Sequence, residues 1–587
     1  MPVHRYWSCL PFVVLVVLSA ARAAEKLPFQ EGRFEKGTLK YVGQLPNRRR
    51  HTMRRFLIAC LLGWCCLAAS RATADVEPAS LFSDGMVLQC DAKAPVWGTA
   101  DAGEKVTVTL GTHRTEATAG QHGKWMAKLG PMEAGGPFEM TIAGKNTVTI
   151  KNVMVGEVWV CSGQSNMEFT LLAAANGKEE VAKADYPAIR TFRVAMTMAE
   201  QPRSECQGVW ALCKPPGVGW FSAVGYFFAK QIHLDRKVPV GIINCAVGGT
   251  TAQVWTSRKT LEADPELKTI RADWEAWVAD YPRRKQQHAR DMVKWKEEAE
   301  KAKAEGKAAP SQPWLPDPKG YSWQPSALYN GMVAPLAPYA IRGVIWYQGE
   351  SDAATAHRYR THFPALIGDW RATWRQRELP FLFVQLPNFG EIRPEPGPSG
   401  WAELQEAQLL TALTVPNTGM AVTIDIGEAK DIHPKNKQDV GNRLALAARG
   451  LVYGEKIVYS GPIYDSMTVE GRAIRLKFRH VGGGLVARGG IPLRQFAIAG
   501  TDKKFVWADA RIDGDTVVVS SDKVPQPVAV RYAWADNPEG CNLYNKEGLP
   551  ASPFRTDGGR AGFGLPARQV TFRGLTNSDT CVRSSKG

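Results

Sequence analysis

The stretch VGEVWVCSGQSNMEF, residues 155–169, joins an apolar run to a short polar segment and then to a helix-like continuation. The apolar run is typical of a buried strand, and the polar residues begin where that strand would end. Two serines, Ser162 and Ser165, lie in the polar segment. Because Ser-Gly pairs are common in turns, the segment is either an ordinary polar turn or a site that holds one serine out as a nucleophile.

Similar apolar runs alternate with helical stretches between residue 153 and about residue 450. The runs are VPVGIINCAVGG, IRGVIWYQG, LPFLFVQLP and TGMAVTIDIG, and the expected helices cover residues 221–234, 355–376, 401–413 and 439–451. Alternation of continuously apolar strands with helices indicates a parallel sheet covered on both faces. The predicted fold class is therefore α/β.

Short strands of alternating pattern flank this region on both sides. Residues 75–150 predict a small antiparallel β-sandwich, and alternation resumes from about Gly461. We therefore expect an N-terminal β-rich domain at 75–150, an α/β domain at 151–455 and a C-terminal β-rich region at 456–587. Residues 258–308 are dense in Lys, Glu and Ala, which predicts a solvated helical insertion.

The first 74 residues contain two segments patterned like signal peptides. Each has a basic start, an apolar core of about 10–14 residues and small residues at its exit. The segment at 53–74 is the expected signal peptide, which makes 1–52 a mis-assigned start and places the mature chain near Asp75. Neither core is long enough to span a bilayer comfortably, so we expect a secreted or periplasmic protein with no stable membrane span; the alternative is a retained N-terminal anchor.

The composition indicates a globular protein and argues against a nucleic-acid partner. A hydrophobic content of 44% and a charged content of 22% are those of a globular protein. The net charge of +16 would favour a polyanionic partner, but residues 1–74 contribute 12 basic against 3 acidic residues, which leaves 61 against 54 for the rest. No Lys/Arg-rich run with interleaved aromatic residues follows, so no nucleic-acid partner is expected.

The cysteine and histidine spacings argue against a metal site. Seven of the 11 cysteines follow residue 74, and Cys206 and Cys213 are close enough to bridge a small loop. No CxxC pair exists, which argues against a thiolate zinc site or a redox dithiol. His357 and His362 are five apart on an expected helix and would not share one face for a metal.

Unusual residues mark four of the expected strand ends. They are the serine segment at 162–166, the glycine pair at 248–249, Gln348 with Glu350, and Asp431 close to His433. Reactive groups gather beyond the carboxyl ends of strands in an open parallel sheet. A hydroxyl, glycine amides, a side-chain amide and an imidazole are what an ester hydrolase needs, because serine requires a base and its oxyanion requires fixed donors. By pattern alone, a serine hydrolase and a purely structural explanation are equally supported, and the G-x-S-x-G elbow of α/β-hydrolases is incomplete here.

The motifs themselves resemble a known family. GEVWVCSGQSNMEF, GGTTAQVWTS, IWYQGESDA and DIHPKNKQDVGNRLALAA resemble the sialate O-acetylesterase family, part of the wider GDSL/SGNH hydrolase group. RYAWADNPEGCNLYNKEGLPASPFRTD resembles the C-terminal end of the same family, so the likeness covers roughly residues 76–556. The resemblance implies a flavodoxin-like SGNH hydrolase core with a parallel sheet and accessory β-sandwich regions at both ends.

The same resemblance implies a function. It indicates a serine esterase that removes O-acetyl groups from carbohydrates without a metal or cofactor, foremost a 9-O-acetyl sialic acid deacetylase whose partner is an O-acetylated sugar or glycan. Two alternatives stay open. One is an esterase for acetylated xylan or another polysaccharide, and the other is a non-catalytic carbohydrate-binding protein on a hydrolase scaffold.

The resemblance also assigns roles to individual residues. Ser165 matches the nucleophile, and its own amide would join the oxyanion hole. Gly249 matches the glycine donor position, with Gly248 as its neighbouring candidate. Gln348 falls where the wider group has an asparagine donor, and His433 matches the general base.

The orienting acid departs from the pattern of the wider group. That group has its acid three residues before the histidine, but Lys430 occupies this position. Asp431 stands two residues before the histidine and is the assigned acid, Asp425 is the reserve, and a Ser–His dyad is the third option. Asn166 and Glu350, beside the predicted catalytic residues, are assigned to substrate binding.

Overall fold

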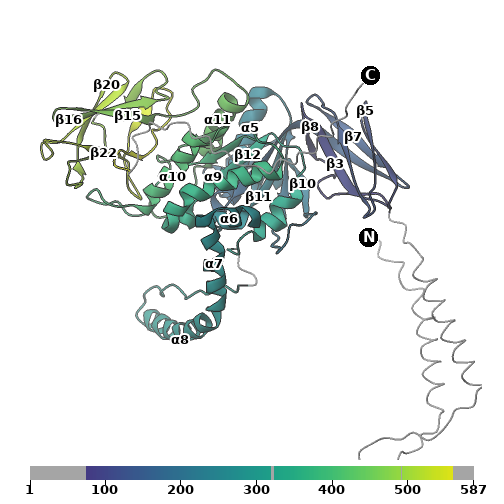
Figure 1. The fold of residues 1–587 in the computed structure, drawn as a ribbon, viewed down its shortest axis with the longest axis horizontal. Helices are drawn as coiled ribbons and strands as arrows, with labels where there is room; N and C mark the ends of the chain where they lie inside the picture. Colours follow the sequence, from purple (N-terminus) through teal and green to yellow (C-terminus); the bar gives the residue numbers. More distant parts are fainter. Residues whose placement is uncertain (1–74, 319–322, 491, 559–587) are drawn as a thin grey trace, which may run out of the picture. The chain divides into compact units, whose positions relative to one another are not determined.

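The structure is a computed structural model that describes residues 75–318, 323–490 and 492–558. The predicted export segments at 1–74 lie outside the described residues. Within the described ranges, no helix is both long enough and apolar enough to cross a membrane. The chain has a mixed α/β fold (Figure 1).

A mixed sheet forms the centre of the α/β region. Its strand order is β10-β9-β11-β8-β12-β13-β14. The strands are β8 (Thr147–Gly163), β9 (Tyr186–Val194), β10 (Gly208–Cys213), β11 (Val240–Ala246), β12 (Gly343–Tyr347), β13 (Phe381–Val384) and β14 (Thr418–Ala421). All neighbours from β9 to β14 pair in parallel, whereas β10 pairs antiparallel with β9. The all-parallel prediction is corrected at this edge, because β9 and β10 are joined without a helix and the chain returns in the opposite direction.

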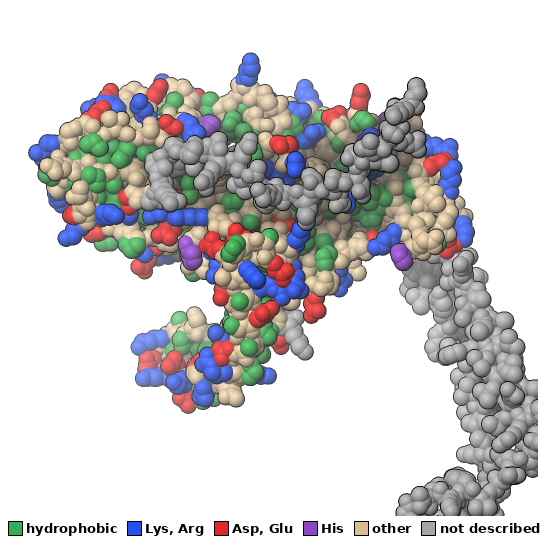
Figure 2. All heavy atoms as spheres, viewed as in Figure 1, with side chains coloured by type: hydrophobic (Ala, Val, Ile, Leu, Met, Phe, Trp, Pro, Cys, Tyr) green, Lys and Arg blue, Asp and Glu red, His purple; other side chains and the backbone are tan. Residues whose placement is uncertain are grey.

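The helices predicted for the α/β region are all present. The described α-helices are α3 (Ser165–Glu168), α4 (Gly177–Lys183), α5 (Ala223–Arg236), α6 (Arg258–Ala263), α7 (Pro265–Ala279), α8 (Tyr281–Ala304), α9 (Ala356–Thr373), α10 (Gly400–Thr414) and α11 (Lys437–Ala447). Residues 258–304 are almost wholly helical, and α8 has no buried residue. Charges of both signs are mixed over this helical segment (Figure 2), as expected of a solvated helix.

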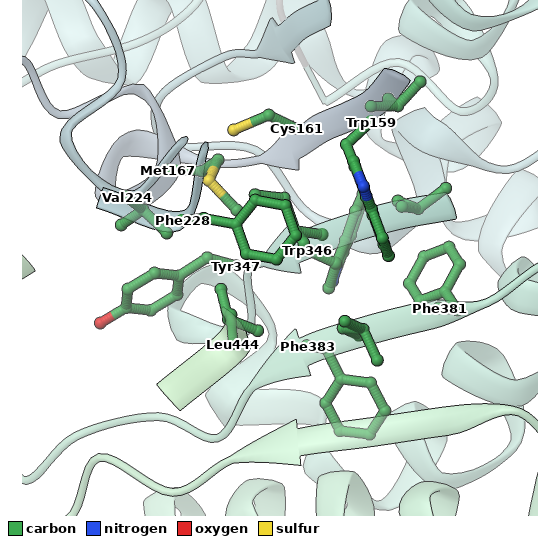
Figure 3. Packing of buried hydrophobic residues seen from close by; sticks show 14 of the residues in the cluster. Trp159, Cys161, Met167, Val224, Phe228, Trp346, Tyr347, Phe381, Phe383 and Leu444 are labelled. Carbon is green, nitrogen blue, oxygen red and sulfur yellow. The ribbon is translucent and has the colours of Figure 1, made fainter. Parts of the chain in front are cut away.

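Large apolar side chains fill both faces of the sheet (Figure 3). On one face, Trp159 of β8 packs edge-on against Phe228 of α5, with ring centroids 5.0 Å apart. On the other, Trp346 of β12 lies 6.3 Å from Phe363 of α9. All four side chains are fully buried, which rigidly fixes the strands whose ends carry the polar residues.

Strand-rich regions precede and follow the α/β region. The first contains β1 (Glu77–Pro78), β2 (Val87–Gln89), β3 (Ala94–Thr99), β4 (Lys105–Leu110), β5 (His113–Thr118), β6 (Lys124–Leu129) and β7 (Gly135–Ala143). The second contains β15 (Ile463–Glu470), β16 (Ala473–Arg479), β17 (Leu485–Ala487), β18 (Phe496–Ala499), β19 (Val506–Trp507), β20 (Asp509–Asp513), β21 (Thr516–Ser520), β22 (Ala529–Tyr532), β23 (Leu543–Asn545) and β24 (Phe554–Arg555). β8 pairs with β7 at its start and with the central sheet at its end, so one strand crosses the expected boundary at 150/151.

The cysteines that could have bridged a loop do not do so. Cys206 and Cys213 are both free and buried. Burial raises the pKa of the Cys206 thiol to about 11 and that of the Cys213 thiol to about 12. Both therefore act as small apolar residues in the core.

Candidate active site

Ser165 follows the turn after β8, whereas Ser162 lies buried at the end of that strand. Gly163 has φ +132°, and a Cβ at this position would collide with the Tyr347 carbonyl of β12, so only glycine fits. The Gln164 amide donates to that same carbonyl at 3.0 Å, and α3 begins at Ser165. Ser162 is fully buried and its Oγ donates to the Cys245 carbonyl at 2.5 Å. Of the two serines, only Ser165 lies beyond the carboxyl end of β8 and contacts a reactive side chain.

That partner is His433. Its Nε2 lies 2.8 Å from Ser165 Oγ, although the two residues are 268 positions apart in the chain. His433 belongs to the loop between β14 and α11, and its ring stacks on Phe169 with a 6.3 Å centroid separation. An imidazole at this distance is placed to accept the hydroxyl proton of the serine.

The acidic residues near His433 differ from the full triad pattern. Asp431 Oδ1 lies 3.6 Å from His433 Nδ1, beyond hydrogen-bond distance, and accepts the His433 backbone amide at 2.9 Å. Its side chain is 46% exposed. Asp425, the alternative candidate for the acid, is engaged elsewhere. Its carboxylate pairs with Arg443 at 2.6 and 2.8 Å and accepts a hydrogen bond from the Tyr544 hydroxyl. Asp425 is thus a buried structural acid, and Asp431 is the acid nearest to the imidazole.

The two glycines after β11 have different environments. Gly248 N–H donates to Glu168 Oε2 at 2.9 Å, so this amide is already engaged. Gly249 is exposed, has φ +68°, and its N–H has no partner among the described residues. The same holds for the Ser165 N–H. Among the described residues, the amides of Ser165 and Gly249 are therefore the candidate oxyanion donors without a partner, whereas the Gly248 amide is bonded to Glu168.

Gln348, predicted to be an oxyanion donor, bonds to groups inside the protein. Its side chain is fully buried, and Nε2 donates to the Thr250 carbonyl at 3.1 Å and to Asp352 Oδ2 at 2.6 Å. Its Oε1 accepts the Tyr359 hydroxyl at 3.0 Å. Both of its donor hydrogens are thus used inside the protein. Gln348 anchors the residue after the glycine pair instead of donating to an oxyanion, and burial raises the pKa of its partner Asp352 to about 6.

Asn166 and Glu350, predicted to bind substrate, belong to a hydrogen-bond network beside His433. Asn166 is 1% exposed, and its Nδ2 donates to Glu350 Oε1 at 2.5 Å and to the Ile432 carbonyl at 2.9 Å. Its Oδ1 accepts from Lys437 Nζ at 2.6 Å, and Lys437 Nζ also donates to the Pro434 carbonyl at 2.5 Å. The network therefore holds the carbonyls on both sides of the histidine. Asn166 thus contacts the segment that carries His433, and Glu350 contacts Asn166.

Lys437 is the residue of this network that the sequence reading missed. It is completely inaccessible to solvent, and its Nζ lies 4.8 Å from the centroid of the Phe169 ring. Burial lowers the pKa of Lys437 to about 7, while the nearby Glu350 opposes that shift. Burial likewise raises the pKa of Glu350. Its only sequence signal is its place in DIHPKNKQ, four residues after His433, because lysine is ordinarily an exposed residue.

The described residues contain one group of potential metal ligands, formed by Cys90, Asp91 and Glu157. The Glu157 carboxylate is paired with the Arg342 guanidinium at 2.7 and 3.1 Å. This group lies toward the start of the parallel part of β8, whereas Ser165 follows the end of that strand. At Ser165 the structure places a hydroxyl, an imidazole and backbone amides.

Three comparisons agree with this chemistry. The family model described as "Carbohydrate esterase, sialic acid-specific acetylesterase" matches residues 155–276 and 306–449. The sialate O-acetylesterase of Rattus norvegicus is 30% identical over 81% of this chain and 93% of its own length. That of Homo sapiens is 29% identical over 81% of this chain and 91% of its own length.

A solved structure gives the same result for the fold. A carbohydrate acetylesterase from Xanthomonas citri is 38% identical, with a TM-score of 0.70, and the match covers 82% of this chain and 100% of that chain. The ranges that the family model matches include the end of β8, the glycine pair, β12 and the His433 loop. The chain therefore belongs to the sialate O-acetylesterase family of carbohydrate esterases.

Proposed function

We propose that this chain is a serine esterase that removes O-acetyl groups from carbohydrates, foremost from 9-O-acetylated sialic acids. The observation that carries the proposal is the 2.8 Å contact between Ser165 Oγ and His433 Nε2 at the end of β8. Membership of the family adds the carbohydrate ester as the class of substrate. An acetylated polysaccharide is the second candidate, because the similar protein from Xanthomonas citri is described only as a carbohydrate acetylesterase.

The proposed mechanism uses only groups of the protein. Ser165 Oγ attacks the acetyl carbonyl while His433 Nε2 accepts its proton. The Ser165 and Gly249 amides donate to the oxyanion of the tetrahedral intermediate, each worth roughly 3–4 kcal/mol of barrier. The intermediate collapses to an acetyl-enzyme as His433 returns the proton to the sugar oxygen. Water, deprotonated by His433, then attacks the acetyl-enzyme, and His433 returns this proton to Ser165 Oγ as acetate is released.

We also propose the type of α/β core, the domain boundaries and the cellular location of the protein. A flavodoxin-like SGNH core with accessory β-sandwich regions at both ends is supported by the parallel order β9-β11-β8-β12-β13-β14 and by the flanking strands. The proposed domains are 75–150, 151–455 with the insertion at 258–308, and 456–587. The pattern of 53–74 supports a signal peptide and hence a secreted or periplasmic enzyme.

A substrate panel tests the proposed function. We expect the purified chain to hydrolyse p-nitrophenyl acetate and to release acetate from 9-O-acetyl-N-acetylneuraminic acid faster than from acetylated xylan. Faster release from xylan would transfer the assignment to the polysaccharide. No acetate release from any of the three esters by a folded chain would leave the carbohydrate-binding alternative.

Replacing Asp431 by asparagine should have a small effect. We expect kcat/KM for p-nitrophenyl acetate to fall about 10-fold or less, because Asp431 is half exposed and makes no hydrogen bond to the imidazole. A buried aspartate that bonds the imidazole is worth roughly 10⁴-fold in kcat. Asp425→Asn is the control and should lower Tm without lowering kcat. A loss near 10⁴-fold for Asp431→Asn would instead make Asp431 a full triad acid.

A further inference from the structure

A cavity of about 590 Å³ lies beside the nucleophile, at the carboxyl ends of β9 and β11. Its wall includes Glu168, three residues after Ser165, and Val247, directly before the glycine pair. A Cβ placed on Gly248 would lie 3.3 Å from the Cβ of Ser165, so Gly248 lies next to the nucleophile. The cavity wall therefore includes chain neighbours of both the nucleophile and the glycine pair.

One polar side chain in the wall of this cavity has no partner in the protein. Asn244 is 7% exposed, its Oδ1 is buried without a hydrogen bond, and its side chain donates no bond to any described residue. A buried amide left without partners costs free energy of about 1–3 kcal/mol. The Asn244 amide therefore adds no hydrogen bond to the fold, and a ligand in the cavity would supply its missing partner.

The residue paired with Asn244 on the neighbouring strand carries a positive charge. Arg193 of β9 is in register with Asn244 and lines the same cavity. Its side chain is 58% exposed and makes one long contact, 3.6 Å, with Glu168 Oε1. The other carboxylate oxygen of Glu168 accepts the Gly248 amide. Most of the five N–H donors of the guanidinium thus stay available, in the planar geometry that fits a carboxylate.

We propose that this cavity binds the sugar that carries the acetyl group, that Arg193 binds a carboxylate on that sugar, and that Asn244 bonds one of its hydroxyl or amide groups. The inference rests on the esterase function proposed above and assigns residues of this chain to the recognition of an acidic, O-acetylated sugar such as a sialic acid. Met196 and Val209, 55% and 71% exposed at the cavity wall, offer apolar contact to the sugar ring. Binding at Arg193 is remote from the ester and orients it for attack.

Arg193→Gln tests the carboxylate contact. We expect kcat/KM for 9-O-acetyl-N-acetylneuraminic acid to fall about 10–100-fold, mainly through KM, since a charge-assisted hydrogen bond is worth about 1.5–3 kcal/mol. Turnover of p-nitrophenyl acetate and of acetylated xylan should stay within about threefold of wild type. Arg203→Gln is the matched control, because Arg203 is an exposed arginine between β9 and β10 that does not line the cavity.

Asn244→Leu separates a ligand contact from a structural role. Leucine has a similar shape and removes a buried amide that has no partner, so Tm should be unchanged or higher. The KM for the sialic acid ester should rise several-fold while p-nitrophenyl acetate turnover is kept. A fall in Tm with unchanged KM would show that Asn244 serves the fold and would overturn its assignment.

The outcomes distinguish the subsite from the esterase function. An Arg193→Gln variant that affects all three esters equally, or none of them, overturns the carboxylate assignment even if the wild-type chain is an active esterase. A selective loss on the sialic acid ester supports it. If the wild-type chain hydrolyses no ester at all, the proposed function fails first, and the subsite with it.

Discussion

Replacing Ser165 by alanine should lower kcat for an acetyl ester by roughly 10⁴–10⁶-fold, the range seen when a serine nucleophile is removed from a hydrolase. The residue supplies the attacking oxygen, and within the described part of the chain its side chain bonds only to His433, at 2.8 Å. Alanine leaves the backbone amide of residue 165 in place, so part of the oxyanion stabilisation persists. Steady-state hydrolysis of p-nitrophenyl acetate measures the loss, and the thermal unfolding midpoint checks that the fold is intact.

Ser162→Ala is the internal control for this experiment. Its Oγ donates to the Cys245 carbonyl in the core, so alanine should cost about 1 kcal/mol of stability and leave kcat within about threefold. Both serines lie in one turn, and each substitution removes only the Oγ hydroxyl. A folded Ser165→Ala variant with near wild-type turnover, or a larger loss for Ser162→Ala, would refute Ser165 as the nucleophile.

The arrangement of strands and helices was readable from the sequence because it depends on local periodicity. Continuous apolar runs indicated β8, β11, β12, β13 and β14, and the polar residues after them indicated the strand ends at which Ser165 and His433 meet. β9 and β10 were not among the predicted strands, and the direction of β10 could not be predicted either. GVWALC at 208–213 is apolar in either direction, and only the helix-free connection from β9 makes it antiparallel.

The roles of the polar residues at this edge were less predictable. Gln348, Asn166 and Glu350 are polar residues directly after strands, a position that suits a ligand contact and a buried structural bond equally well. Which of the two applies depends on partners from other strand ends, such as Thr250 for Gln348 and Ile432 for Asn166. Such pairings are long-range and leave no periodic trace in the chain, so their separation from the ligand-facing groups required the three-dimensional structure.

Replacing Lys437 by methionine should impair both the fold and the base. Methionine matches the length of the lysine stem but removes both hydrogen bonds of Nζ, which leaves Asn166 Oδ1 and the Pro434 carbonyl without this donor. Each buried group left unpaired costs about 1–3 kcal/mol. We therefore expect a loss of about 3 kcal/mol in the free energy of unfolding, measured by urea denaturation.

Activity should fall further than this loss of stability explains. The Pro434 and Ile432 carbonyls flank His433, and a displacement of about 1 Å in a catalytic group can cost roughly 10²-fold in rate. We expect kcat for p-nitrophenyl acetate to fall about 10²-fold at a temperature well below the new Tm, with a parallel fall in the rate at which a fluorophosphonate labels Ser165. Both readouts report the geometry of the Ser165–His433 pair in folded molecules.

Two further variants separate positioning from general destabilisation. Lys435→Met changes an exposed lysine on the same loop and should alter neither Tm nor kcat. Ile474→Ala removes a fully buried side chain from β16, so it should lower Tm by a comparable amount and leave kcat and Ser165 labelling unchanged. If Lys437→Met behaved like Ile474→Ala, with a lower Tm and normal labelling, Lys437 would stabilise the fold without positioning the base. Slow labelling in Lys437→Met alone would establish that the buried network aligns His433 for catalysis.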